Sequence, residues 1–87
     1  MTHPDRAIHR ERLIAFLETI RRPETPLDVV ADDDGLVSSG LIDSLALLEI
    51  IAFLEDEFGL DFGERGVDPE ELTSVSRILE LLEQELR

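Results

Sequence analysis

The chain has 87 residues and no cysteine, and its eight Arg and 21 Asp or Glu give a formal net charge of −13. This length predicts a single domain, residues 1–87, with a core too small for a deep enzyme cleft, and without cysteine neither disulfides nor cysteine-based sites can form. The acidic surface argues against nucleic acid and anionic membranes as partners and favours proteins with basic patches.

The first predicted element is a helix from Pro4 to Ile20, because apolar residues recur there at helical spacing. Pro4 fits the first helical turn, and Thr2 or His3 would lie at the cap. Pro23 ends the pattern, because the residue before a proline is pushed out of helical geometry.

The basic residues are concentrated in this first element. Residues 1–22 carry a net charge of +2, whereas residues 23–87 carry −15. The sequence begins without the apolar stretch of a signal peptide, and its longest apolar run, Ile50–Leu54, is far too short to cross a bilayer. We therefore expect a soluble, cytoplasmic monomer.

A long connection follows, from Pro23 to Asp43, and loops of this length are as a rule functional or disordered. Its run of three acids, Asp32–Asp34, matches no calcium-binding loop and is expected to be solvated, so no metal site is predicted. Val29-Val30 could form a short strand, although no second strand exists to pair with it. Apolar residues argue against disorder and should hold the connection on the helices: Leu27, Val29, Val30, Leu36, Val37, Leu41 and Ile42.

The second predicted helix runs from about Ser44 to Phe58, and Gly59 is suited to its C-terminal cap. It is apolar nearly all round, so it is either the central core element or exposes part of its surface to a partner. For Leu45, Leu48 and Ala52, core packing and partner contact remain equally open.

The remaining elements are shorter. We expect a loop over Leu60–Gly66 and then a short helix over Asp68–Leu72 with Asp68 as its N-cap. The last helix should run from Ser74 or Val75 to Leu86. Its inward-facing residues would be Val75, Ile78, Leu79, Leu81, Leu82 and Leu86. The predicted fold class is therefore all-α.

Ser44 is the strongest candidate for a functional residue. It lies where the loop becomes the helix, at the positive end of the helix dipole, where backbone N–H groups lack partners. A hydroxyl there is well placed to carry a phosphate-linked group, and Asp43 is expected to cap the helix. A Ser-His-Asp hydrolase is disfavoured, because there is no nucleophile-elbow pattern and the only histidines, His3 and His9, are expected on the surface of the first helix.

The stretches Gly40–Leu45, Leu48–Ile51 and Leu54–Gly59 resemble an acyl carrier protein or a related peptidyl or aminoacyl carrier domain. Pro69–Val75 is similar to the family's short third helix and the start of its fourth. The resemblance covers most of the chain from Leu36 onward. It implies an acyl-carrier-protein-like four-helix bundle with three main helices, a short third helix and a long ordered first loop.

The resemblance also implies a function. Ser44 would carry 4′-phosphopantetheine, transferred from coenzyme A by a separate Mg²⁺-dependent phosphopantetheinyl transferase that recognises Asp43. The thiol of this arm would hold an acyl or aminoacyl group as a thioester. The chain would then not be an enzyme; it would present its cargo to a loading ligase and to downstream acyl-transfer enzymes.

The same resemblance implies a surface for partner enzymes on the second helix, at Leu45, Leu48, Glu49, Ala52 and Asp56. Helical spacing places these residues on one face beside Ser44. Ala46, Leu47 and the bulky Leu41-Ile42 pair depart from common fatty-acid carriers and favour a carrier of amino acids or specialised acyl groups. The alternative is an unmodified acidic helical adaptor that binds basic partners through its second helix.

Overall fold

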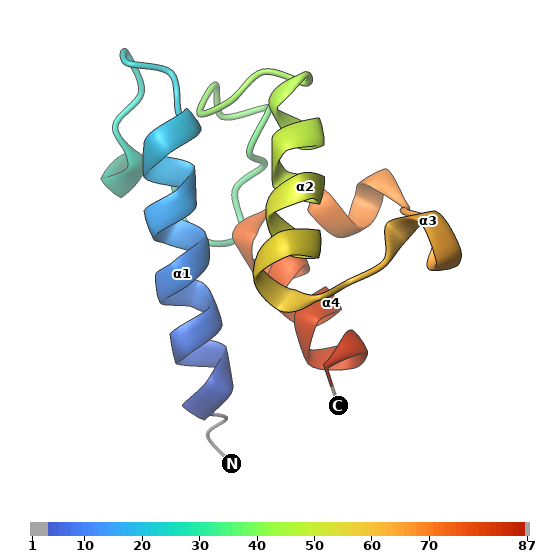
Figure 1. Cartoon of the computed structure of the whole chain (residues 1–87). Helices are drawn as coiled ribbons and strands as arrows, with labels where there is room; N and C mark the ends of the chain where they lie inside the picture. Colours follow the sequence, from blue (N-terminus) through green and yellow to red (C-terminus); the bar gives the residue numbers. More distant parts are fainter. Residues whose placement is uncertain (1–3, 87) are drawn as a thin grey trace.

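The computed structural model describes residues 4–86, which form helices and connecting turns with no strand (Figure 1). The α-helices are α1 (Pro4–Ile20), α2 (Ala46–Phe58), α3 (Phe62–Arg65) and α4 (Val75–Glu85), and two 3₁₀ turns are η1 (Leu27–Val29) and η2 (Pro69–Leu72). The predicted all-α class is confirmed, and the alternative of a strand at Val29-Val30 is wrong, because Val29 ends η1. The expected cap at Thr2 or His3 lies outside the described residues.

One apolar core joins α1, α2, α4 and the long connection. The helices contribute fully buried leucines and isoleucines, and the Phe16 and Phe53 rings stack between α1 and α2 with centroids 4.2 Å apart. Phe58 packs edge-on against Phe53 at 5.8 Å. The fully buried helical residues include Leu13, Leu17, Ile50, Leu54, Ile78 and Leu82. As a result, α2 presents one side to the core and leaves the other free.

The connection between α1 and α2 is ordered by buried side chains and by backbone hydrogen bonds to Thr73, at the end of η2, and to the first turn of α4. Leu36, Leu41 and Ile42 are buried, as predicted. The Leu36 N–H donates to the Thr73 carbonyl oxygen (2.8 Å) and the Ser76 N–H donates to the Asp32 carbonyl oxygen (2.9 Å). These bonds hold the connection against the start of α4.

Two residues of this connection were predicted to hold it and do not. Val29 is 68% exposed and Val37 is 43% exposed. Val37 follows the buried Leu36 in a tight turn, and neighbouring side chains of a turn point in different directions, so only one of the pair reaches the core.

The ends of α2 differ from each other in how well their position was predicted. The helix begins at Ala46 rather than at Ser44, because residues 43–45 form a tighter turn whose carbonyls accept from the N–H groups three positions on. Its C-terminus is at Gly59, as predicted, where φ is +74°. This left-handed conformation favours glycine and stops the helix.

The segment after Gly59 contains a helix where a loop was expected. Phe62–Arg65 forms α3, a single turn capped by the Asp61 carboxylate, which accepts from the Glu64 N–H at 3.0 Å. The predicted short helix is present as η2, with Asp68 at its N-cap and a capping box completed by Glu71.

The last helix, α4, is capped by the Ser74 hydroxyl, which accepts from the Arg77 N–H at 3.1 Å. Its inward-facing residues are buried as predicted except Leu86, which is 41% exposed because the helix ends one residue before it.

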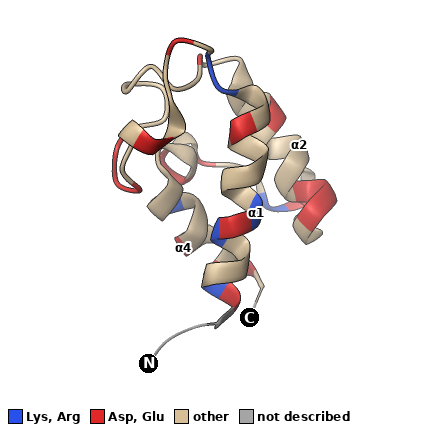
Figure 2. Cartoon of the chain, turned by 90° about the vertical axis from the view of Figure 1, so that its left-hand side faces the viewer, with Lys and Arg blue, Asp and Glu red and all other residues tan. Residues whose placement is uncertain are grey.

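Arginines of α1 pair with acidic residues from three other segments, which relieves part of the negative charge. Figure 2 shows where the basic and acidic residues lie along the ribbon. Arg6 pairs with Glu83 of α4, and Arg12 pairs with Glu57 of α2 at 3.2 Å. Arg10 forks onto both oxygens of Asp32 at 2.8 Å and holds the pKa of that carboxyl below its ordinary value. No helix within residues 4–86 has the length and apolarity that crossing a bilayer requires.

Candidate functional site

The turn Asp43–Leu45, which contains Ser44, is fixed by the residues before it. Leu41 and Ile42 are fully buried, and the Arg22 N–H donates to the Leu41 carbonyl oxygen at 2.8 Å. Gly40 has a φ of +84°, which residues with a side chain rarely adopt. The chain therefore enters the turn from an anchored position, and Ser44 is the second residue after the last buried one.

The Asp43 side chain caps the turn of residues 43–45 that leads into α2, whereas the N-cap position of α2 itself is Leu45, which makes no side-chain cap hydrogen bond. The Asp43 Oδ1 accepts from the Ala46 N–H at 3.0 Å, and the Asp43 carbonyl oxygen accepts from the same N–H at 3.2 Å. Among the residues that the structure describes, the Ser44 and Leu45 N–H groups have no hydrogen-bond partner. These free donors add a partial positive charge beside the serine hydroxyl.

Ser44 is exposed, and within residues 4–86 its hydroxyl makes no hydrogen bond. A free, solvent-facing hydroxyl at the start of a helix is accessible to a modifying enzyme. An anionic group attached to it would lie near the unpaired N–H groups, where the helix dipole contributes about 0.3–1 kcal/mol. The geometry thus suits a phosphate ester better than an internal nucleophile.

The predicted partner face lies on the solvent side of the turn and α2. Leu45 is 74% exposed and Leu48 is 66% exposed, and Glu49, Ala52 and Asp56 are exposed as well. Core packing is therefore excluded for the two leucines and for Ala52. The face combines apolar side chains with acidic ones, an arrangement found in transient interfaces with basic partners.

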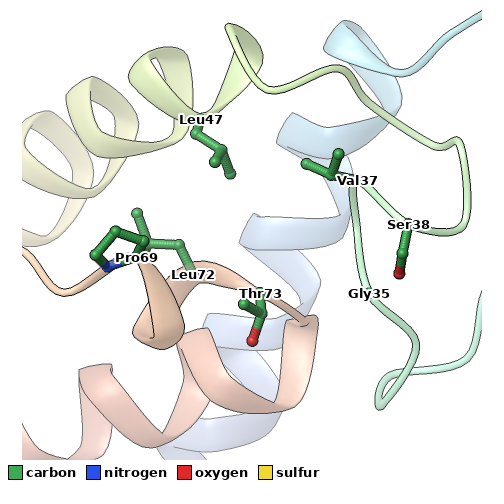
Figure 3. A pocket seen from close by; sticks show the side chains of 7 residues that line it. All are labelled: Gly35, Val37, Ser38, Leu47, Pro69, Leu72 and Thr73. Carbon is green, nitrogen blue, oxygen red and sulfur yellow. The ribbon is translucent and has the colours of Figure 1, made fainter.

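A second feature lies beside this face: an apolar pocket of about 330 Å³ between the long connection, α2 and η2 (Figure 3). Leu47 and Val37 point into it from one side, and Pro69 and Leu72 line the other. The remaining lining residues are Gly35, Ser38 and Thr73, so no charged side chain lines the pocket.

This pocket lies close to Ser44. Leu47 is three positions after Ser44, and its N–H donates to the Ser44 carbonyl oxygen at 3.3 Å. Residues three apart in a helical turn are neighbours, with Cβ atoms about 5–6 Å apart. Sequence reasoning missed the pocket: Leu47 stood out as an unusual apolar residue, but Val37 was expected to pack against the helices.

His9 does not take part in this site. It is half-buried in α1 with its ring edge-on to Phe58, centroids 5.0 Å apart, so its expected surface position is wrong; His3 lies outside the described residues. Phe58 is the last residue of α2, whereas Ser44 lies just before the first, and a helix of this length spans about 20 Å. His9 therefore cannot activate the Ser44 hydroxyl. Within residues 4–86 no group of three or more His, Asp or Glu is arranged to hold a metal ion.

Comparisons of the chain with protein-family models, with curated proteins and with solved structures gave no match. The functional interpretation therefore depends on the geometry of the Ser44 turn, the exposed face of α2 and the pocket.

Proposed function

We propose that this chain is a carrier protein that holds an acyl group as a thioester on a 4′-phosphopantetheine arm attached to Ser44. The observation that carries the proposal is the presentation of Ser44: an exposed hydroxyl that follows the buried Leu41-Ile42 pair directly after Asp43, whose carboxylate caps the same turn. The proposal includes an acyl-carrier-protein-like arrangement of the bundle, with its long ordered first loop and short third helix.

The attachment chemistry is a phosphoryl transfer from coenzyme A, catalysed by a phosphopantetheinyl transferase with Mg²⁺. The Ser44 Oγ forms a bond to the β-phosphorus, the bond from that phosphorus to the bridging oxygen breaks, and adenosine 3′,5′-bisphosphate leaves. The hydroxyl proton passes to a base of the transferase. On this chain, Asp43 and the exposed face of α2 would provide the surface that the transferase reads.

The pocket beside Ser44 supports an acyl cargo over an aminoacyl one. Its lining side chains are apolar apart from the hydroxyls of Ser38 and Thr73. Burying an ammonium group there without a carboxylate partner would carry a large desolvation cost, whereas burying a CH₂ group contributes about 0.8 kcal/mol. The cargo that fits is therefore an acyl group with an apolar end.

Partner enzymes would meet the solvent side of α2. Leu45 and Leu48 supply apolar anchors, and Glu49 and Asp56 supply charges that attract basic surfaces. The carrier would work in the cytoplasm, where coenzyme A is available, as a monomer that a loading ligase and acyl-transfer enzymes bind in turn.

The test is the intact mass of the chain after incubation with coenzyme A, Mg²⁺ and a broad-specificity phosphopantetheinyl transferase. We expect a gain of one phosphopantetheine group, lost in Ser44→Ala and kept in the matched control Ser38→Ala, which alters another exposed serine of the same region. A folded wild-type chain that gains no mass would refute the carrier function, and a gain in Ser44→Ala would refute the site.

The exposed leucines also favour one other function, an unmodified acidic adaptor. Such an adaptor would bind basic partners through Leu45 and Leu48 without any group on Ser44. The Ser44→Ala variant distinguishes the two functions. An adaptor would bind its partner with unchanged affinity, whereas a carrier would no longer deliver an acyl group to its acyl-transfer enzymes.

A further inference from the structure

The side of the pocket formed by η2 has little apolar packing of its own. Every residue from Gly63 to Glu70 is exposed, Leu60 and Phe62 are buried before this stretch, and within η2 the one buried residue is Leu72. A segment with so few buried contacts opens locally at low free-energy cost. Polar interactions must therefore contribute to holding η2 in place.

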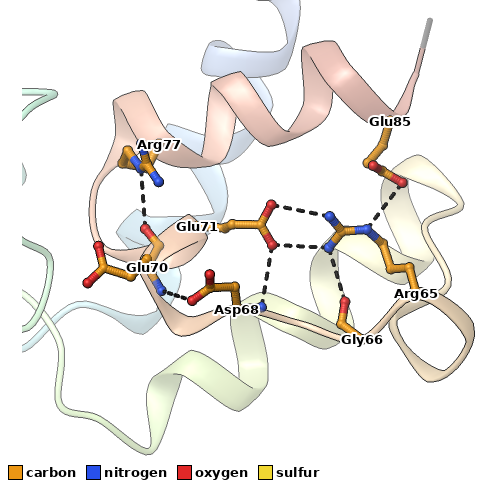
Figure 4. Close-up of polar contacts among 7 residues, drawn as sticks. All are labelled: Arg65, Gly66, Asp68, Glu70, Glu71, Arg77 and Glu85. Atoms are coloured by element: carbon orange, nitrogen blue, oxygen red, sulfur yellow. Dashed lines mark hydrogen bonds and ion pairs between the residues drawn. The ribbon is translucent and has the colours of Figure 1, made fainter.

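Arg77 of α4 supplies one such interaction, because its Nε donates to the Glu70 carbonyl oxygen at 3.4 Å, and Arg65 supplies the others through all three of its guanidinium nitrogens (Figure 4). Nη1 and Nη2 each donate to one carboxylate oxygen of Glu71 at 3.2 Å, and Nη1 also donates to the Gly66 carbonyl oxygen at 3.1 Å. Nε lies 3.2 Å from Oε1 of Glu85. The guanidinium carbon is 5.7 Å from the centre of the Phe62 ring. We call Arg65, Glu71 and Glu85 the Arg65 cluster; it joins α3, η2 and α4.

The Arg65 cluster is more sheltered than the other pairs between helices. The side chains of Arg65 and Glu71 are 26% and 20% exposed, against 52% and 41% for Arg12 and Glu57. Reduced exposure weakens screening by solvent, and a forked arginine–carboxylate pair is stronger and more directional than a single contact. In keeping with this, Arg65 holds the pKa of the Glu71 carboxyl below its ordinary value.

Glu71 connects the Arg65 cluster to the pocket. It lies within η2, between two residues that line the pocket, Pro69 and Leu72. Its carboxylate also accepts from the Asp68 N–H at 3.4 Å and so completes the capping box of η2. The C-terminal end of η2 is held as well, because the Leu36 N–H donates to the carbonyl oxygen of Thr73, the residue that follows Leu72, and so ties η2 to the connection on the other side of the pocket. Arg65 thus holds the part of η2 that faces α3 and α4.

We propose that Arg65 is a positioning residue for the pocket beside Ser44: it holds η2 against α3 and α4 and thereby keeps the pocket able to bind an apolar group. The proposal rests on the carrier function only for the identity of that group, an acyl chain on the Ser44 arm. The apolar pocket and its dependence on Arg65 are properties of the unmodified chain.

The first test measures the motion of η2 by hydrogen exchange with mass spectrometry on the unmodified full chain. The Glu70 and Glu71 N–H groups donate within the cap of η2, to Asp68, so their exchange reports whether this segment is held. We expect exchange over residues 66–73 to rise at least about tenfold in Arg65→Gln. Arg65→Lys should resemble it, because lysine cannot fork onto a carboxylate.

The matched control is Arg12→Gln, which removes the same charge from an ion pair between α1 and α2, away from η2. It should leave exchange over residues 66–73 unchanged. If Arg65→Gln does not fold, Glu71→Gln is the second variant, because it removes the forked pair and leaves Arg65 with Glu85. Equal exchange in wild type and in the folded Arg65 or Glu71 variants would overturn the proposal.

The second test measures the pocket itself by titrating the same proteins with the neutral apolar dye Nile red. The dissociation constant should rise at least about threefold in Arg65→Gln and stay unchanged in Arg12→Gln. No binding to wild type, or equal affinity in wild type and Arg65→Gln, would overturn the role of Arg65 in the pocket. Both tests use the unmodified chain, so a failure of Ser44 to accept phosphopantetheine would refute the carrier function and leave their outcome intact.

Discussion

Replacing Asp43 separates its contribution to stability from the recognition that the carrier proposal assigns to it. Asp43→Ala removes the Oδ1 atom that accepts from the Ala46 N–H at 3.0 Å. Loss of an N-cap costs about 0.5–2 kcal/mol. Because Asp43 is exposed and its carbonyl oxygen still accepts from the same N–H, we expect the lower half of this range, about 0.5–1 kcal/mol. In a domain of this size that corresponds to a fall in Tm of about 2–8 °C.

Asp43→Asn is the matched control, because its side-chain oxygen can accept the same hydrogen bond. It loses only the negative charge at the helix N-terminus, worth about 0.3–1 kcal/mol at low ionic strength and less in salt. In moderate salt its Tm should therefore lie close to that of wild type. Under the carrier proposal, the loss of the carboxylate should nevertheless slow the modification of Ser44.

Thermal unfolding followed by circular dichroism measures the first role, and the initial rate of mass gain with coenzyme A and the transferase measures the second. A Tm of Asp43→Ala within a degree of wild type would refute the capping argument. An Asp43→Asn variant that is modified at the wild-type rate would refute recognition of the carboxylate and leave the cap untouched.

Leu36→Ala should lower the free energy of unfolding by about 3–5 kcal/mol, because Leu36 is fully buried and the change leaves a cavity; urea denaturation showing a loss under 1 kcal/mol would contradict its role as an anchor of the connection. Gly59→Ala should cost about 1–2 kcal/mol through its left-handed φ of +74° alone, because an added Cβ would meet nothing within 4 Å; an unchanged midpoint in urea would be evidence against this account. Lowering the pH from 7 towards 5 should first raise the Tm, because the net charge of −13 repels itself. Below about pH 4 the Tm should fall, because arginines lower the folded-state pKa values of Asp32 and Glu71 from their ordinary values of 3.8 and 4.5. The stability that these two carboxylates contribute is present above their ordinary pKa values and is lost as the pH falls through their folded-state pKa values. A Tm that declines steadily from pH 7 to 5 would argue against dominant self-repulsion.

Local signals in the sequence correctly predicted the residues at which α1 begins, α2 ends and η2 is capped. Pro4, Gly59 and Asp68 each act through their own backbone or through residues two or three positions away, so neighbouring sequence is sufficient to place them. The Asp43 cap belongs to the same class, and so does the exposure of Ser44 that follows from it.

Other features depend on contacts between distant segments, and these were missed or wrong. A single turn such as α3 leaves no periodic pattern, and Gly63 and Gly66 concealed it. The apolar character of Val37 and Leu86 predicted burial, but the neighbouring chain leaves both exposed. The pocket beside Leu47 and the Arg65 cluster are assembled from segments far apart in sequence, so neither could be derived from spacing.

The hydrogen bond between the Leu36 N–H and the Thr73 carbonyl oxygen has a consequence for the order of folding. Contacts between segments so far apart form only after the entropy of closing the intervening chain has been overcome. During synthesis Ser44 leaves the ribosome before Thr73, and the connection that leads into its turn is not anchored until α4 begins to dock. An enzyme that recognises the folded turn would therefore act after translation of the α4 region, and a chain truncated before Thr73 would escape modification.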